Sequence, residues 1–259
     1  MVFAPHQDDE TLGCGGLIAL KRQWGVPVSV VFLTDGHASP ASSQLNSHEI
    51  TRMRKQEAIA ALDILGVASK EIHFLDQPDQ GLRYLSQEQR RSLVKQLVQL
   101  LERFKPDEVY VTHQFDLHPD HEATFELVRA AVTKTEQKIE LFQYPIWAMW
   151  APWRIKSLAK SPSCYRLPIK EGIAKKRLAL KAYRSQWEAL APDADVSLPP
   201  EFLSLFLSSH EIFFKVQPEI NAPVRLSRQT ELKTGFLVSM GKRDKEERVR
   251  TANAKNRFI

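Results

Sequence analysis

The chain has 259 residues, 43% hydrophobic and 26% charged, a composition that suits a globular protein with one large core. No apolar run reaches the ~20 residues of a membrane span, and Cys14 and Cys164 give no disulfide framework, so we expect a cytoplasmic protein without a membrane span. The net charge of +5 does not favour a nucleic-acid partner, because residues 221–259 hold ten basic and four acidic side chains and the rest is nearly neutral.

The predicted elements alternate between strand and helix along the chain. Residues 1–4 form an apolar stub, short for a central strand, and a helix starts near Thr11. Further strands are predicted at 28–34, 72–75, 108–112, 139–144 and 210–216, and helices at 47–66, 86–104, 120–133 and 170–190. This alternation predicts an α/β fold with a Rossmann-like, mostly parallel sheet covered by helices on both faces.

We expect a single α/β domain over residues 1–220 and a basic C-terminal tail over residues 221–259. The stretch 151–168 contains three prolines and is predicted to be irregular, followed by a C-terminal extension of the same domain. A basic tail of this kind is more often a solvated end than a binding element.

Two clusters of acids and histidines each follow a predicted strand and precede a helix. The first is PHQDDE at residues 5–10, and the second is HPDHE at residues 118–122. In open α/β sheets ligand sites form at the carboxyl ends of the strands, so we expect the two clusters to meet there.

These residue types suit a catalytic zinc site, which usually has three nitrogen or oxygen ligands and a position for water. His6 and Asp9 are three residues apart, so one turn can direct both inward, and His121 can supply the third ligand. Spacing alone does not decide between Asp8 and Asp9, and a rival assignment makes His118 the ligand in place of His121. The other acids and histidine are then available for acid–base and electrostatic catalysis.

The two clusters resemble the PIG-L/LmbE-like family of zinc-dependent N-deacetylases, whose signatures are a Pro-His-Pro-Asp-Asp-Glu loop and a downstream His-Pro-Asp-His. Weaker resemblances follow at Thr34-Asp35-Gly36, at residues 54–57 and 74–79, and at Ser185-Gln186. The match is dense over residues 1–145. Gln7 replaces the family's usual proline, and Tyr183 stands where the family often has a histidine.

The resemblance implies a role for each of eight residues. His6, Asp9 and His121 would bind the metal, Asp8 would be the general base, and His118 would stabilise the oxyanion or assist the leaving group. Asp120 would orient His118, and we expect its carboxylate to accept a hydrogen bond from that ring and raise the pKa of His118. Arg54 and Asp79 would contact the sugar.

The implied activity is that of a metal-dependent amidase that removes an N-acetyl group from a small N-acetylglucosamine-type conjugate, with Zn²⁺ or, in the cell, Fe²⁺. Two alternatives stay open: a hydrolase of another amide or ester, and a non-catalytic protein that binds metal or nucleic acid. Asp8 argues against the second, because holding zinc does not require it.

Two further sequence features have structural interpretations. The glycines of LGCGG, residues 12–16, are predicted to allow close helix packing, with Cys14 a small buried residue and a fourth metal ligand only as the minor alternative. The tryptophans Trp147, Trp150 and Trp153 suit core packing or an interface between copies of the chain, and also stacking on a sugar.

Overall fold

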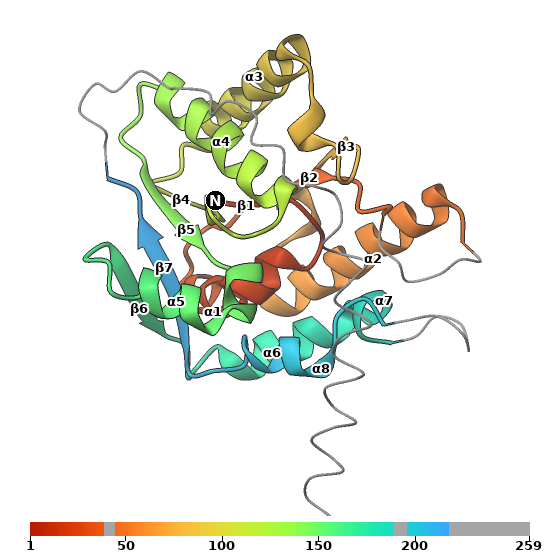
Figure 1. The fold of residues 1–259 in the computed structure, drawn as a ribbon, viewed down its shortest axis with the longest axis vertical. Helices are drawn as coiled ribbons and strands as arrows, with labels where there is room; N and C mark the ends of the chain where they lie inside the picture. The colour runs from red at the N-terminus through yellow and green to blue at the C-terminus, as the bar shows by residue number, and fades with distance from the viewer. Residues whose placement is uncertain (39–44, 189–195, 218–259) are drawn as a thin grey trace, which may run out of the picture. The chain divides into compact units, whose positions relative to one another are not determined.

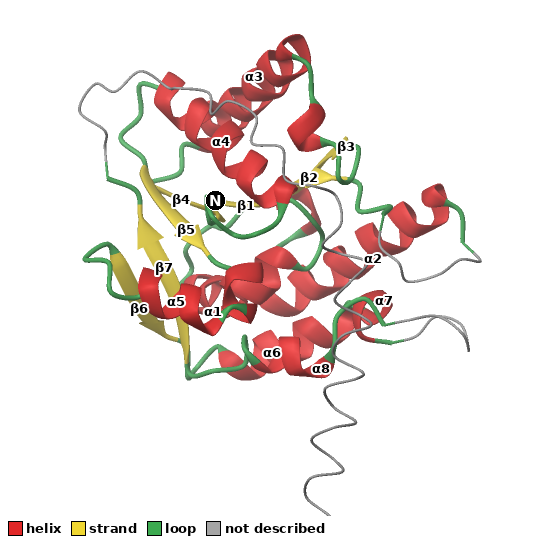
Figure 2. Cartoon of the chain, viewed as in Figure 1, coloured by secondary structure: helices red, strands yellow, loops and turns green. Residues whose placement is uncertain are grey.

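A seven-stranded sheet organises residues 1–38, 45–188 and 196–217, the part of the chain that the computed structural model describes (Figures 1 and 2). The strand order is β3-β2-β1-β4-β5-β7-β6. Five strands pair in parallel: β1 (Val2–Ala4), β2 (Val30–Thr34), β3 (Ile72–Gln77), β4 (Glu108–Thr112) and β5 (Glu140–Tyr144). The last two, β7 (His210–Lys215) and β6 (Cys164–Pro168), are antiparallel to their neighbours. The predicted mostly parallel sheet is confirmed.

Helices cover both faces of the sheet, as predicted (Figure 1). One core contains side chains of α1 (Asp9–Gln23), α2 (Ser47–Leu65) and α6 (Ile173–Ala182), and the other those of α3 (Gln87–Phe104) and α4 (Pro119–Lys134). Strand β2 is apolar from Val30 to Leu33 because both of its faces are buried: Val30 and Phe32 enter the first core, and Val31 and Leu33 enter the second.

Local signals set the ends of the long helices. Ser86 caps α3 and forms a capping box with Gln89, as the sequence predicts. Helix α2 ends at Gly66, whose φ of 91° suits glycine, and its start is capped by Asn46, one residue before the predicted range. The predicted helix over 170–190 is instead two helices, α6 and α7 (Arg184–Trp187), which are separated at the buried Tyr183.

The stretch 151–168 is not irregular, contrary to prediction. It contains α5 (Pro152–Leu158) and strand β6. Strand β6 lies at the sheet edge with its side chains half-buried or exposed, so it lacks the apolar pattern that marks the inner strands. The remaining short helices are α8 (Pro200–Ser204) and the 3-10 turns η1 (Ser69–Glu71), η2 (Leu82–Tyr84) and η3 (Trp147–Trp150).

Helix α1 is held at its middle by a buried ion pair. Lys176 Nζ lies 2.7 Å from Glu211 Oε1 and donates to the carbonyl of Leu12 at 2.7 Å. The Glu211 carboxylate accepts hydrogen bonds from the backbone N–H groups of Gly16 and Leu17, at 2.7 and 2.8 Å. Strand β7 is therefore tied to the first helix of the chain.

Close packing around α1 confirms the interpretation of its glycines. A Cβ atom on Gly13 would lie 2.2 Å from the Tyr144 ring, and one on Gly16 would lie 2.6 Å from Ile169. Cys14 is fully buried in the hydrophobic core, which argues against its being a metal ligand. No helix among the described residues is long and apolar enough to span a membrane. The predicted basic tail lies outside the described residues.

Candidate active site

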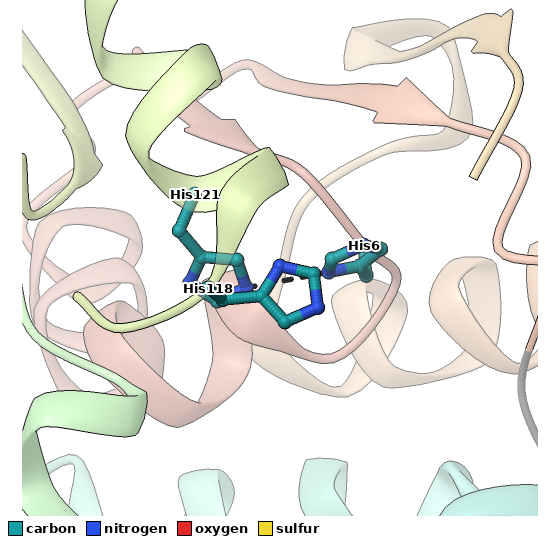
Figure 3. A group of neighbouring side chains, drawn as sticks. All are labelled: His6, His118 and His121. Carbon is teal, nitrogen blue, oxygen red and sulfur yellow. Dashed lines mark hydrogen bonds between the residues drawn. The ribbon is translucent and has the colours of Figure 1, made fainter. Parts of the chain in front are cut away.

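The two histidine–acid clusters meet at the carboxyl edge of the sheet. Strand β1 leads into the loop of residues 5–8 and then α1, and its neighbour β4 leads through residues 113–118 into α4. Figure 3 shows the result: His6 comes from the first loop, and His118 and His121 approach it from the start of α4. The predicted meeting of the two clusters is confirmed.

Three ligand atoms form a nearly equilateral triangle. His6 Nδ1 lies 3.2 Å from Asp9 Oδ2, His121 Nε2 lies 3.3 Å from the same oxygen, and the two nitrogens are 3.3 Å apart. Ligand atoms at ordinary bond lengths around a tetrahedral zinc ion are about 3.4 Å apart. The triangle therefore fits three ligands of one metal ion.

The far nitrogen of each of these histidines faces a carboxylate. His6 Nε2 lies 3.1 Å from Asp79 Oδ1, and His121 Nδ1 lies 2.6 Å from Asp116 Oδ2. A proton shared with a carboxylate on the far side leaves the near nitrogen deprotonated, which is the form that binds a metal. Both rings thus have the tautomer and the orientation that the triangle requires.

Sequence reasoning missed Asp116. Its carboxylate is fully buried and also accepts backbone hydrogen bonds from Ile146, Trp147 and Ala148, at 2.8, 3.1 and 3.1 Å. It links the loop after β4 to the loop after β5. The available signal was its place in the sequence, since it is an acid between the end of a strand and the second cluster.

Other donor sets lie in the same place. Ligand atoms of His6, His118 and His121 lie within 4.8 Å of one another, and so do those of His6, Asp79 and Asp120. In the second set both carboxylates already have backbone partners, Ala38 for Asp79 and Gln80 for Asp120. The first set is compatible with the alternative assignment, in which His118 is a metal ligand.

The prediction that the Asp120 carboxylate accepts a hydrogen bond from the His118 ring is wrong. Asp120 accepts hydrogen bonds from the backbone of Gln80 and Leu82, at 2.7 and 3.2 Å, and only its own N–H reaches His118 Nδ1, at 3.2 Å. In the first turn of α4 the Asp120 side chain is directed to the η2 segment, while His118 caps the helix. Burial, with the charges of His121 and His6, lowers the pKa of His118 to about 2 rather than raising it.

Asp8 is buried beside the triangle in an unusual backbone conformation. Its φ of 142° is rare for a residue other than glycine, and its N–H donates to Glu10 Oε2 at 3.1 Å. Burial raises the pKa of Asp8 to about 8, against the opposing charge of Arg54, whose Nη2 lies 3.4 Å from Asp8 Oδ2. Glu10 in turn accepts a hydrogen bond from the hydroxyl of Tyr183, so the junction between α6 and α7 contacts the start of α1.

Arg54 and Asp79, the predicted sugar contacts, are both nearly inaccessible. Arg54 donates to the carbonyl of Gln7 and approaches Asp8, and the two oxygens of Asp79 face His6 and the Ala38 N–H. The structure thus places them against the loop and the metal triangle. Their contact with a sugar stays a prediction.

The three tryptophans differ in their environment. Trp147 is half-buried and stacks on His118, with ring centroids 6.3 Å apart and planes 18° from parallel, and it also packs on Phe202. Trp150 and Trp153 are exposed at 43% and 70%. Core packing therefore accounts for Trp147, whereas an interface between copies of the chain stays a prediction for the other two.

Fold and site together define an α/β protein with a cluster of histidines and carboxylates that could hold a metal ion, at the carboxyl edge of its sheet. Residues 1–132 match the family model "PIG-L: GlcNAc-PI de-N-acetylase", which is half of the chain. The chain belongs to this family. A relative from Bacillus subtilis, named probable N-acetyl-alpha-D-glucosaminyl L-malate deacetylase 2, is 26% identical over 202 residues, covering 76% of this chain and 87% of the relative.

Solved structures share the fold at lower identity. The zinc-inhibited form of teicoplanin deacetylase Orf2 is 22% identical, with a TM-score of 0.64 over 85% of this chain and 98% of that one. GalB, the 4-carboxy-2-hydroxymuconate hydratase of Pseudomonas putida KT2440, is 18% identical, with a TM-score of 0.61 over 86% of this chain and 98% of that one. A hydratase and a deacetylase thus share one fold, which therefore does not by itself fix the reaction.

Proposed function

We propose that this chain is a metal-dependent amidase that removes the N-acetyl group from a small N-acetylglucosamine-type conjugate. The observation that carries the proposal is the triangle of His6, Asp9 and His121, together with the buried carboxylate of Asp8, the residue that precedes Asp9. Membership of the PIG-L family and the name of the Bacillus subtilis relative support the same reaction.

Zn²⁺ is the proposed ion, with Fe²⁺ as the alternative in the cell. His6 Nδ1, Asp9 Oδ2 and His121 Nε2 would hold it, and Asp79 and Asp116 would fix the two rings. When bound, such an ion polarises the amide carbonyl and makes water acidic enough to react near neutral pH.

Asp8 is the proposed general base. A buried carboxyl with its pKa raised toward neutrality can take a proton from the attacking water and later deliver one to the leaving amine. Arg54 limits this rise by placing a positive charge next to the carboxylate. A residue that served only to bind metal would not need these surroundings.

His118 is the proposed donor to the oxygen of the cleaved carbonyl. Its Nδ1 accepts the Asp120 N–H, so the proton of the neutral ring is on Nε2, where it can be donated. Stacking on Trp147 restricts the ring on its other side. Stabilisation of the oxyanion therefore needs no positive charge on His118, and Asp120 would orient the ring through its backbone N–H.

An amine-release assay tests the proposal on the malate, methyl and chitobiose conjugates of N-acetylglucosamine. Metal-depleted protein should be inactive, and stoichiometric Zn²⁺ should restore turnover. Asp8→Asn should keep its zinc and lose about 10²–10⁴-fold in kcat, while Asp63→Asn, an exposed acid on α2, should match the native protein. Turnover that is independent of metal, or hydration of an unsaturated acid without amine release, would contradict the proposal.

The cytoplasmic location and the association of the chain with itself stay predictions.

A further inference from the structure

Gln7 lies between the proposed ligand His6 and the proposed base Asp8, where family members usually have proline. Its side chain is fully buried. Burying an amide costs free energy unless its NH₂ group and its oxygen form hydrogen bonds, so we expect both halves of the Gln7 amide to have partners.

The NH₂ group of that amide connects the loop of residues 5–8 to the neighbouring strand β2. Gln7 Nε2 donates to the carbonyl of Thr34, at the end of β2, at 2.8 Å. Thr34 bonds back to the loop, because its N–H and its hydroxyl both donate to the Pro5 carbonyl, at 3.0 and 2.7 Å. A proline would restrict this loop through its ring, whereas Gln7 ties it to β2.

The other half of the amide faces Arg54. Gln7 Oε1 and Arg54 Nε are both buried and have no hydrogen-bond partner among the described residues. Both border Gly36: a Cβ atom there would lie 2.2 Å from Gln7 Oε1 and 3.2 Å from Arg54 Nε. One atom is an acceptor and the other a donor. Because Gly36 has no side chain, nothing from that residue stands against either atom.

The backbone of Gln7 already binds the same guanidinium, since Arg54 Nη2 donates to the Gln7 carbonyl. Nε and Nη2 lie on one edge of the guanidinium plane and donate in parallel. A second hydrogen bond, from Nε to Gln7 Oε1, would complete a two-point contact on that edge. The second hydrogen of Nη2 then stays available for Asp8 Oδ2, at 3.4 Å.

We propose that Gln7 is a positioning residue that holds Arg54, and through it the Asp8 carboxylate, by accepting Nη2–H on its backbone carbonyl and Nε–H on its side-chain carbonyl. The inference rests on the proposed function of Asp8. Proline at this position supplies only the first acceptor. The chain therefore has a side-chain support for the base that the usual family sequence lacks.

A double-mutant cycle tests whether Gln7 acts through Arg54. Gln7→Met preserves the length of the side chain and removes the amide. It should lower kcat about tenfold, with less than a twofold change in KM and zinc content. In the Arg54→Ala background the same substitution should cost less than twofold, because its target is gone. Equal losses in both backgrounds, no loss in the native background, or loss of zinc from Gln7→Met would overturn the proposal.

A matched variant and a spectroscopic measurement complete the test. Gln77→Met removes a half-buried amide whose Nε2 donates to the carbonyl of Leu75 in its own strand, and should leave kcat unchanged. NMR of ¹⁵N-arginine protein should show one guanidinium Nε–H, absent in Arg54→Ala, that exchanges slowly in the native protein and at least tenfold faster in Gln7→Met. Unchanged exchange would overturn the proposal even if no conjugate is deacetylated, whereas absent turnover with this exchange pattern would count only against the proposed function.

Discussion

Asp116→Asn tests the metal triangle through a residue that does not belong to it. Asp116 Oδ1 accepts from Ile146 and Ala148, and Oδ2 accepts from Trp147 and from His121 Nδ1. If the asparagine oxygen takes the Oδ1 position, its NH₂ group faces His121 and donates to Nδ1. The proton of His121 then moves to Nε2, the atom directed at the metal.

The cost should be seen mainly in metal affinity. Loss of a carboxylate behind a metal-binding histidine typically weakens binding 10–100-fold, which is about 1.4–2.7 kcal/mol. The metal-free protein should itself lose about 1–3 kcal/mol of unfolding free energy, because the N–H of Trp147 is left without its acceptor. The increase in melting temperature that zinc produces should therefore be smaller in Asp116→Asn than in the native protein.

Competition with a chromophoric chelator at pH 7.5 measures the affinity, and thermal unfolding with and without zinc measures the linked stability. Asp107→Asn, at a loop acid outside the site, serves as the control for the change of charge. Zinc affinity of Asp116→Asn within twofold of native would refute the reasoning, because the tautomer of His121 would then not matter for the metal.

Three further outcomes are expected. His118→Ala should lower kcat by about 10²–10³-fold with full zinc content, and loss of zinc would instead identify His118 as a ligand. Lys176→Met leaves the Glu211 carboxylate buried without its cation and should lower the free energy of unfolding by about 3–5 kcal/mol in urea titrations, a loss below 1 kcal/mol being contrary to a buried pair. Burial lowers the pKa of His113 to about 4, so the unfolded chain binds more protons between pH 6.5 and 4 and stability falls as the pH is lowered through that range. Relative to His113→Asn, the native protein should lose about 2–3 kcal/mol between pH 7 and 4, and a constant difference would count against this account.

The parts of the fold that sequence reasoning captured are those with local causes. Strand β4 was predicted at its observed bounds because its β-branched and aromatic residues, Val109 to Thr112, are typical of a strand and are all buried. The two clusters were expected at one edge because each follows a parallel strand. Helix α3 was expected to start at Ser86 because serine is a typical capping residue, and its partner in the capping box, Gln89, is only three residues away.

The parts that it missed depend on contacts between distant segments. The direction of the Asp120 carboxylate depends on the backbone of Gln80 and Leu82, about 40 residues earlier. The break at Tyr183 interrupts a sequence with good helical spacing, and its hydroxyl reaches Glu10 across the fold. Three of the four groups that face the Asp116 carboxylate are backbone N–H groups about 30 residues later, at Ile146, Trp147 and Ala148. Periodicity reports which side of an element is buried, but not which partner buries it.

The hydrogen bonds between Glu211 and helix α1 can form only late in the synthesis of the chain. The two residues that they join most directly, Gly16 and Glu211, are separated by 195 positions. At ordinary rates of synthesis roughly 10–40 s pass between their emergence from the ribosome. Throughout that time His6 and Asp9 are already synthesised, and the middle N–H groups of helix α1 still lack the Glu211 carboxylate. A nascent chain that has not reached residue 210 cannot supply it. The loop that carries the proposed ligands His6 and Asp9 is therefore made well before the carboxylate that secures the helix after it.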